Sequence, residues 1–491
     1  MFSVDSEKRF FNEMFDHSCA VRPCYETIYN YFNNLSPMML EHLKNKAEHG
    51  FVNLGVTFRV YHESTSMERT IPFDILPRLI PEEEWTILDE GCRQRVRALN
   101  AFLYDIYHGQ EILHDQVIPR ELVVTHPDFC WAMAGLHVPL NEYITLAGID
   151  VIRDNEGKYF VLEDNLRVPS GISYVYENRK MMQQLFPELC QNHQIEPIMP
   201  SLSYLARYLQ SLSPRRVSKP TVVLLTPGPY NAAYYDHVFL SQQLGIDLVE
   251  GQDLMTLDNR VYLRSVEGLR QVDVIYRRVD DAFLDPLVFR PDSMLGVPGL
   301  MSAYRAGHVA LANAPGAGVA DDKAIFAYVP AMIRYYLGEE PILENVPTFL
   351  LKNREEQEYV LHNLEKMVVK KTTGAGGYGM LIGPKASEEE LATFRTILQE
   401  KPHHYIAQPT IQLSQHPSFI NGVFSNRHID LRPFVIGGKK VIPGGLTRVA
   451  LREGSLVVNS SQGGGSKDTW VLRSQGGERE CQLCSTVRPT A

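Results

Sequence analysis

The sequence predicts an α/β protein with additional α+β elements, and three patterns support this fold class. Strand and helix patterns alternate through residues 221–313, a rhythm that indicates a parallel, Rossmann-like sheet. Residues 143–163 contain two apolar runs separated by turn residues at 154–157, which is typical of an antiparallel hairpin. Residues 368–382 contain two strand-like runs that enclose a glycine-rich loop. At 491 residues, the chain is long enough for several domains, each with its own core.

Composition and charge disfavour several classes of protein. The chain is 44% hydrophobic and 22% charged, as is usual for a globular protein, and its formal net charge is −10. This acidity disfavours nucleic acid or an anionic membrane as a partner. No targeting segment is visible, and no apolar run approaches the roughly 18 residues of a membrane span. The seven scattered cysteines are typical of the reduced thiols of a cytosolic protein. We therefore expect a cytoplasmic protein; its oligomeric state is not visible in the sequence.

The patterns divide the chain into consecutive segments. We expect an N-terminal helical segment at 1–50 and a mixed segment at 51–210. A Ser- and Pro-containing linker leads to the Rossmann-like segment 221–313, which is followed by a glycine-rich segment at 314–473. Residues 474–491 are expected to be a flexible tail. The pair Cys481 and Cys484 in this tail is read as a chance spacing, with a metal or redox pair as the open alternative.

Acidic residues at the end of the predicted hairpin form a candidate metal site. Glu163 and Asn165 lie on one face of the second strand by period-two alternation, and Asp150 of the first strand can reach the same face. Two carboxylates and an amide carbonyl are hard oxygen ligands, which magnesium prefers when phosphates complete its shell. Arg167 follows at once and adds a hydrogen-bond donor. The alternative is a surface hairpin with a polar end.

The glycine-rich loop distinguishes two kinds of nucleotide site. Gly374, Gly376 and Gly379 satisfy G-x-G-x-x-G, but a dinucleotide fingerprint must open a helix, and a short strand pattern follows here. A hairpin that covers phosphates with its backbone N–H groups fits better, with a lysine supplying charge. We favour Lys370 for that charge because it directly ends the apolar run. Lys371 remains the alternative, since alternation puts the two lysines on opposite faces.

Two later runs fit the same chemistry. Asp430 and Arg432 share one face of an extended run, and Arg448 enters an apolar strand. An arginine held at the end of a strand can stabilise negative charge on a transferred phosphoryl group and on a tetrahedral intermediate. An exposed strand arginine is the ordinary alternative for Arg448.

Taken together, these runs resemble the ATP-grasp superfamily, and specifically its circularly permuted bacterial type 2 branch, which is related to glutathionylspermidine synthase. The metal ligands come last in the usual ATP-grasp order. Here they come first, and the lysine with its glycine loop, the adenine hinge, Asp-x-Arg and the arginine strand follow in their normal order. The resemblance covers about residues 50–470. It implies a circularly permuted ATP-grasp fold, with 51–210 as its displaced C-terminal half and 221–313 as the pre-ATP-grasp substrate domain.

The resemblance also implies roles for individual residues. It implies ATP and two Mg²⁺ ions as cofactors. The implied catalytic residues are Arg448, Arg432 and Arg167, and the implied metal ligands are Asp150, Glu163 and Asn165. The implied nucleotide-binding residues are Lys323, Lys370, Gly374, Gly376, Gly377, Gly379, the adenine hinge Ala407 and Gln408, and Asn459.

The activity implied is that of an ATP-dependent, peptide-forming carboxylate–amine ligase that acts through an acyl phosphate. The loop reads Gly-Ala-Gly-Gly-Tyr-Gly, unlike the Gly-Arg-Glu-Gly type of the synthases, so the resemblance identifies neither the carboxylate nor the amine. Cys19 and Cys24 lie in a segment too short for a separate amidase domain. The alternatives are a kinase-like phosphotransferase on the same fold, a non-catalytic nucleotide-binding protein and, less favoured, a Rossmann dehydrogenase.

Overall fold

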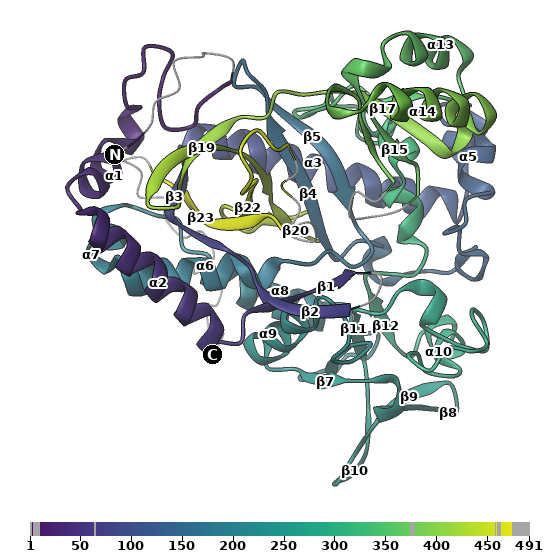
Figure 1. Cartoon of the computed structure of the whole chain (residues 1–491). Coiled ribbons are helices and arrows are strands. Elements are labelled where there is room, and N and C mark those ends of the chain that lie inside the picture. The colour runs from purple at the N-terminus through teal and green to yellow at the C-terminus, as the bar shows by residue number, and fades with distance from the viewer. Residues whose placement is uncertain are drawn as a thin grey trace.

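The computed structural model describes residues 2, 10–62, 65–373, 379–456, 458 and 463–473, with backbone alone for 58–62 and 65–68. Several residues singled out in the sequence lie outside this part: Gly374, Gly376, Gly377, Asn459, Cys481, Cys484 and the tail 474–491. The described chain combines helices with parallel and antiparallel sheets, as the sequence predicts (Figure 1).

The largest sheet joins segments that are far apart in the sequence. Its main path runs β13 (Glu344–Asn345), β5 (Tyr159–Asn165), β4 (Leu146–Arg153), β19 (Val423–Arg432), β22 (Leu446–Val449), β23 (Gly465–Val471) and β3 (Phe73–Ile80). The strands β18 (Gln415–Ile420), β20 (Phe434–Ile436) and β21 (Lys440–Val441) extend it. The predicted hairpin is confirmed as β4–β5, which lies beside β19, and β3 pairs in parallel with β23. Strands from the two ends of the chain therefore share one sheet, as a permuted domain requires.

A second, parallel sheet confirms the Rossmann-like prediction. Its order is β12 (Ala310–Ala312), β11 (Val274–Arg277), β6 (Val222–Leu225) and β7 (Asp247–Val249), and all three pairings are parallel. The helices α8 (Met199–Ser211), α9 (Tyr234–Leu244) and α10 (Leu300–Arg305) belong to this part. A small antiparallel sheet of β8 (Leu254–Leu257), β9 (Arg260–Ser265) and β10 (Gly268–Gln271) projects from it (Figure 1).

A third sheet carries the glycine-rich loop. Its order is β14 (Phe349–Leu350), β17 (Tyr405–Pro409), β15 (Met367–Lys371) and β16 (Leu381–Ile382). It packs with α13 (Arg354–His362) and α14 (Glu388–Glu400) around a small apolar core of its own, in the lobe at the upper right of Figure 1. Because β15 pairs with β16 as an antiparallel hairpin, the loop does not open a helix. The dinucleotide interpretation is therefore wrong.

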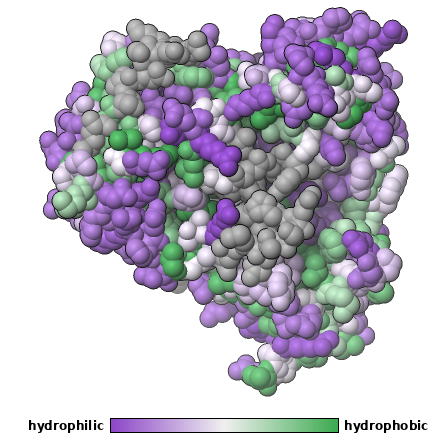
Figure 2. Space-filling view, in the orientation of Figure 1, coloured by the Kyte–Doolittle hydropathy of each residue, from purple (hydrophilic) through white to green (hydrophobic). Residues whose placement is uncertain are grey.

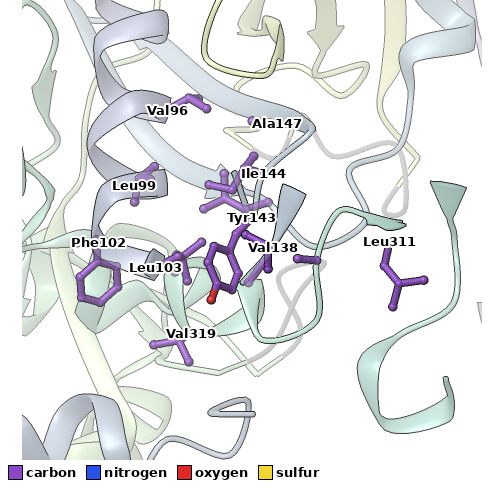
Figure 3. Close-up of a cluster of buried hydrophobic side chains, with 14 of the residues drawn as sticks. Val96, Leu99, Phe102, Leu103, Val138, Tyr143, Ile144, Ala147, Leu311 and Val319 are labelled. Carbon is purple, nitrogen blue, oxygen red and sulfur yellow. The ribbon is translucent and has the colours of Figure 1, made fainter. Parts of the chain in front are cut away.

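The main core lies against one long helix, α3 (Glu82–Ile106). Glutamates occupy its first turn, where they complement the helix dipole. Figure 3 shows its apolar face, with Val96, Leu99 and Leu103 directed toward Tyr143 and Ile144. Outside the residues drawn in grey, hydrophilic side chains predominate on the face seen in Figure 2. None of the helices that the structure describes is long and apolar enough to cross a membrane.

The other α-helices and strands complete the described part of the chain. They are α1 (Glu26–Asn33), α2 (Pro37–Asn53), α4 (Glu111–His114), α5 (Arg120–Val124), α6 (Ile172–Leu185), α7 (Pro187–Asn192), α11 (Lys323–Phe326), α12 (Val329–Met332) and the hairpin β1 (Thr57–His62) and β2 (Thr65–Thr70). Among them, α6 is buried over most of its length.

The N-terminal segment is less peripheral than its sequence indicates. Before its first helix the chain bridges the start of β18 at Asn12, and the buried Glu13 carboxylate contacts two arginines. Arg78 Nη2 lies 2.9 Å and Arg153 Nη1 3.0 Å from its oxygens, while Ser414 Oγ donates at 2.7 Å. Glu13 and Arg78 are both almost fully buried, and Glu13 supplies the carboxylate that compensates the charge of Arg78.

Replacing Glu13 with alanine should lower the free energy of unfolding by about 3–5 kcal/mol, because Arg78 would stay buried without its partner. Urea unfolding followed by circular dichroism measures this change. Glu358→Ala is the control, since it removes an exposed pair with Arg354 that is worth less than about 1 kcal/mol. Equal effects of the two substitutions would contradict the assignment.

Candidate active site

The centre of the site is the carboxylate of Asp150, which two arginines share. Asp150 lies opposite Glu163 in the β4–β5 ladder, and Asp430 lies opposite Arg448 in the β19–β22 ladder. Arg432 donates to both oxygens of Asp150, with Nη2 at 2.8 Å from Oδ2. Arg448 donates to the same Oδ2 from 2.9 Å and also binds Asp430 with Nε at 2.9 and 3.1 Å. The ladder thus brings the two predicted arginines onto one predicted metal ligand.

The two carboxylates respond differently to these arginines. Burial alone would raise the pKa of Asp150, but the guanidiniums of Arg432 and Arg448 outweigh it and lower the pKa to about 2. Asp430 is also fully buried, and there burial prevails over the attraction of Arg448 and raises the pKa. Asp150 is therefore the firmly ionised member of the pair at neutral pH.

Lys323 brings a third part of the chain to the site. It opens the short helix α11, whose N-cap Asp322 accepts hydrogen bonds from Ala324 N and Ile325 N. The Lys323 ammonium lies 3.0 Å from Glu163 Oε1. Its backbone N–H donates to the carbonyl of Thr372 at 3.2 Å, next to the glycine-rich loop. The predicted phosphate-binding lysine is thus fixed between the predicted metal ligands and that loop.

Of the two lysines at the end of β15, Lys370 faces this group. Lys370 Nζ donates to Gln408 Oε1 at 2.8 Å, and Gln408 Nε2 donates to Thr348 Oγ1 at 3.0 Å, which fixes the orientation of the amide. The pKa of Lys370 is lowered to about 8 by burial, with Lys323 adding to the effect and Glu163 opposing it. Lys371 is exposed, as alternation along the strand requires.

Asn165 completes the donor set that the sequence predicts for a metal. Its Nδ2 is buried and has no hydrogen-bond partner among the described residues. Asp164 turns to the other face, where its oxygens accept from Arg95 Nε at 2.6 Å and Nη2 at 2.7 Å. The described residues include no group of three His, Cys, Asp or Glu side chains arranged for a metal. Asp150 and Glu163 face each other across the β4–β5 ladder, with Asn165 on the same face of β5, and their side-chain oxygens would suit magnesium, which takes much of its shell from phosphates and water.

Arg167 lies next to this group but is already engaged. Its Nε donates to Asp321 Oδ2 at 2.9 Å, and Nη1 lies 3.7 Å from Asp128 Oδ2. Burial raises the pKa of Asp321 to about 6 against the attraction of Arg167. Arg167 thus links the end of β5 to the segment that leads into Lys323.

The predicted adenine hinge lies within a strand. Ala407 of β17 pairs with Phe349 on one side and Val369 on the other, and Gln408 contributes its side chain to Lys370. Of the loop glycines, Gly379 is described, and its φ of 70° favours glycine.

The sequence motifs do not include an apolar cluster in which side chains of the β4–β5 hairpin meet the segment that follows the hinge. Its buried members are Ile152, Val346, Leu413, Ala450 and Val458, with the half-buried Phe160, Leu162, Ile411 and Leu456. Half-buried apolar side chains in one cluster form a surface on which an apolar or aromatic ligand can pack. The signals in the sequence were the apolar residues that closely follow the hinge, Ile411 and Leu413.

Comparisons with known proteins agree with the circularly permuted fold. The family described as circularly permuted ATP-grasp type 2 matches residues 77–450. An uncharacterized protein of Synechocystis sp. is 51% identical over 467 residues, which cover 94% of this chain and 97% of that protein. An uncharacterized protein of Mycobacterium tuberculosis is 49% identical over 486 residues, or 97% of this chain and 87% of that protein.

Two further matches are more distant, a Frankia relative and a solved structure. A protein of Frankia alni with the provisional name glutamate–cysteine ligase 2-3 is 41% identical over 468 residues, which cover 94% of this chain and 54% of that protein. A glutathione synthetase-like effector from Globodera pallida, solved in its apo form, superposes with a TM-score of 0.55 at 12% identity. The superposition covers 89% of this chain and 98% of that one, and it shows a shared fold.

Because the pKa of Lys370 depends on its neighbours, two substitutions should move it in opposite directions. Lys323→Met should raise it by removing a like charge, and Glu163→Gln should lower it by removing an opposite charge. The rate at which Lys370 reacts with an acylating reagent, measured by peptide mass spectrometry against pH, reports its pKa. In the unaltered protein the rate should level off above about pH 8. A shift in the same direction in both variants would contradict the arrangement.

Proposed function

Since this chain belongs to the circularly permuted ATP-grasp type 2 family, we propose that it is an ATP-dependent carboxylate–amine ligase. The observation that carries this proposal is the convergence of Lys323, Lys370, Glu163, Asp150 and Arg448 from separate parts of the chain. The names of the Frankia relatives, which are those of ligases, support it.

In the first step, an oxygen of the substrate carboxylate bonds to the γ-phosphorus of ATP. The bond from that phosphorus to the bridging oxygen breaks, so that ADP leaves and an acyl phosphate forms. Lys323 and Lys370 hold the phosphate oxygens, and Arg448 attracts the charge on the transferred group. When bound, magnesium neutralises phosphate charge, with Asp150, Glu163 and Asn165 as its protein ligands.

In the second step, the amine nitrogen bonds to the acyl carbon. The carbon–oxygen bond to phosphate breaks, inorganic phosphate leaves, and the nitrogen gives up a proton to water. Arg448 and Arg432 are suited to stabilise the negative oxygen of the tetrahedral intermediate. Positioning and electrostatics drive both steps, so no protein nucleophile is needed.

Trapping the acyl phosphate tests the ligase proposal. Incubation of the full chain with ATP, magnesium, a panel of carboxylates and hydroxylamine should yield a hydroxamate together with ADP and phosphate. Glu163→Gln should abolish the hydroxamate, since it removes a metal ligand. A stable phosphorylated product without hydroxamate would instead identify a phosphotransferase, and the absence of ADP with every carboxylate would count against an enzyme.

Arg448→Ala should lower turnover by about 10²–10³, as loss of one oxyanion donor does, while much of the ATP affinity persists. Steady-state kinetics and a separate nucleotide-binding titration measure the two quantities. Arg452→Ala is the matched control, because Arg452 is exposed four residues further along the chain. Normal turnover of the Arg448 variant would remove this residue from the mechanism.

A further inference from the structure

A pocket lies outside the candidate active site, between α6 and α9. Its volume is 440 Å³, within the range of small-molecule sites. Residues that follow α2 form part of its wall. The side chains that give it chemical character are Glu177, Lys180, Asn231, Tyr234, Tyr235 and Phe239. None of Asp150, Glu163, Lys323, Lys370 or Arg448 lines it.

Glu177 is the unusual residue of this pocket. It is only 5% exposed, and its Oε2 has no hydrogen-bond partner among the described residues. The ammonium of Lys180 lies 3.8 Å from Oε2, beyond hydrogen-bond distance. A buried carboxylate oxygen without a partner is unfavourable, so Glu177 is suited to a hydrogen-bond donor that enters the pocket.

The surroundings of Glu177 favour a cation as that donor. Burial raises the pKa of Tyr235, and the nearby Glu177 carboxylate raises it further. The rings of Tyr234, Tyr235 and Phe239 line the same pocket. Aromatic faces attract ammonium groups and also pack against apolar side chains.

Lys180 provides the opposite charge at the same pocket. It lies one helical turn after Glu177, and its side chain is 50% exposed. Glu177 and Lys180 thus present a buried negative charge and a solvent-facing positive charge side by side. This arrangement complements a small molecule that carries an ammonium and a carboxylate on neighbouring atoms.

We propose that this pocket binds a free α-amino acid with an apolar side chain. Its ammonium group binds Glu177, its carboxylate binds Lys180, and its side chain packs against the rings of α9. The pocket binds its ligand without nucleotide, so the binding is separable from ligase activity.

Three probes that share a phenyl ring and carry different charged groups test the assignment. L-phenylalanine carries both charges, phenethylamine only the ammonium, and 3-phenylpropionate only the carboxylate. Isothermal titration calorimetry of the full chain should detect L-phenylalanine and phenethylamine and no binding of 3-phenylpropionate. Absence of L-phenylalanine binding up to about 10 mM would overturn the proposal.

Variants of the two charged residues separate their contributions. Glu177→Gln should weaken both ammonium-carrying probes at least about tenfold, which corresponds to about 1.4 kcal/mol. Lys180→Met should weaken L-phenylalanine but strengthen phenethylamine, because it removes a carboxylate partner and a like charge. Glu188→Gln, an exposed carboxylate on α7, is the control and should change neither. Unchanged binding in the Glu177 variant, or equal effects of Lys180→Met on both probes, would contradict the assignment.

Discussion

The shared carboxylate of Asp150 is the constraint on which the rest of the site depends. Asp150 comes from the first third of the chain, and Arg432 and Arg448 come from its last part. A buried carboxylate is costly unless opposite charges surround it, so β4 must lie beside β19 for this residue to remain ionised. The pairing of β4 with β5 places Glu163 opposite Asp150, and there Glu163 contacts Lys323. The predicted metal ligands of this hairpin are therefore held against the arginines of β19 and β22 by one long-range contact.

The site has the opposite electrostatic character to the whole chain. The protein carries a formal net charge of −10, which repels a polyanion at a distance. At the site, however, Lys323, Lys370, Arg432 and Arg448 gather around the carboxylates of Asp150, Glu163 and Asp430. Burial lowers the pKa of Lys370 to about 8, and the like charge of Lys323 adds to the effect. A triphosphate beside the two lysines would stabilise their charged forms, which favours its binding at this point of an otherwise acidic surface.

Local patterns in the sequence were sufficient to predict the strands and the face of the sheet on which each side chain lies. Turn residues marked the β4–β5 hairpin, and alternation separated Lys370 from Lys371. The partners of these residues were not predictable, because they depend on contacts between distant segments. The Arg95–Asp164 pair and the burial of Glu13 arise only when α3 and the N-terminal segment pack on the large sheet. Neither the pair nor the burial is visible in the local sequence, because a charged residue considered alone is expected to be exposed.

Arg448 and Arg432 have different hydrogen-bond partners and can therefore behave differently. Arg448 is anchored by Asp430 as well as by Asp150, so a cation on Asp150 would leave it oriented by the Asp430 carboxylate. Arg432 has Asp150 as its carboxylate partner and otherwise reaches the carbonyl of Ser170 at 3.4 Å. The same cation would therefore weaken the hold on Arg432 far more, because a neutral carbonyl is a weaker acceptor than a carboxylate. With a cation on Asp150, Arg448 would thus stay in place, whereas Arg432 would become free to turn toward another anion.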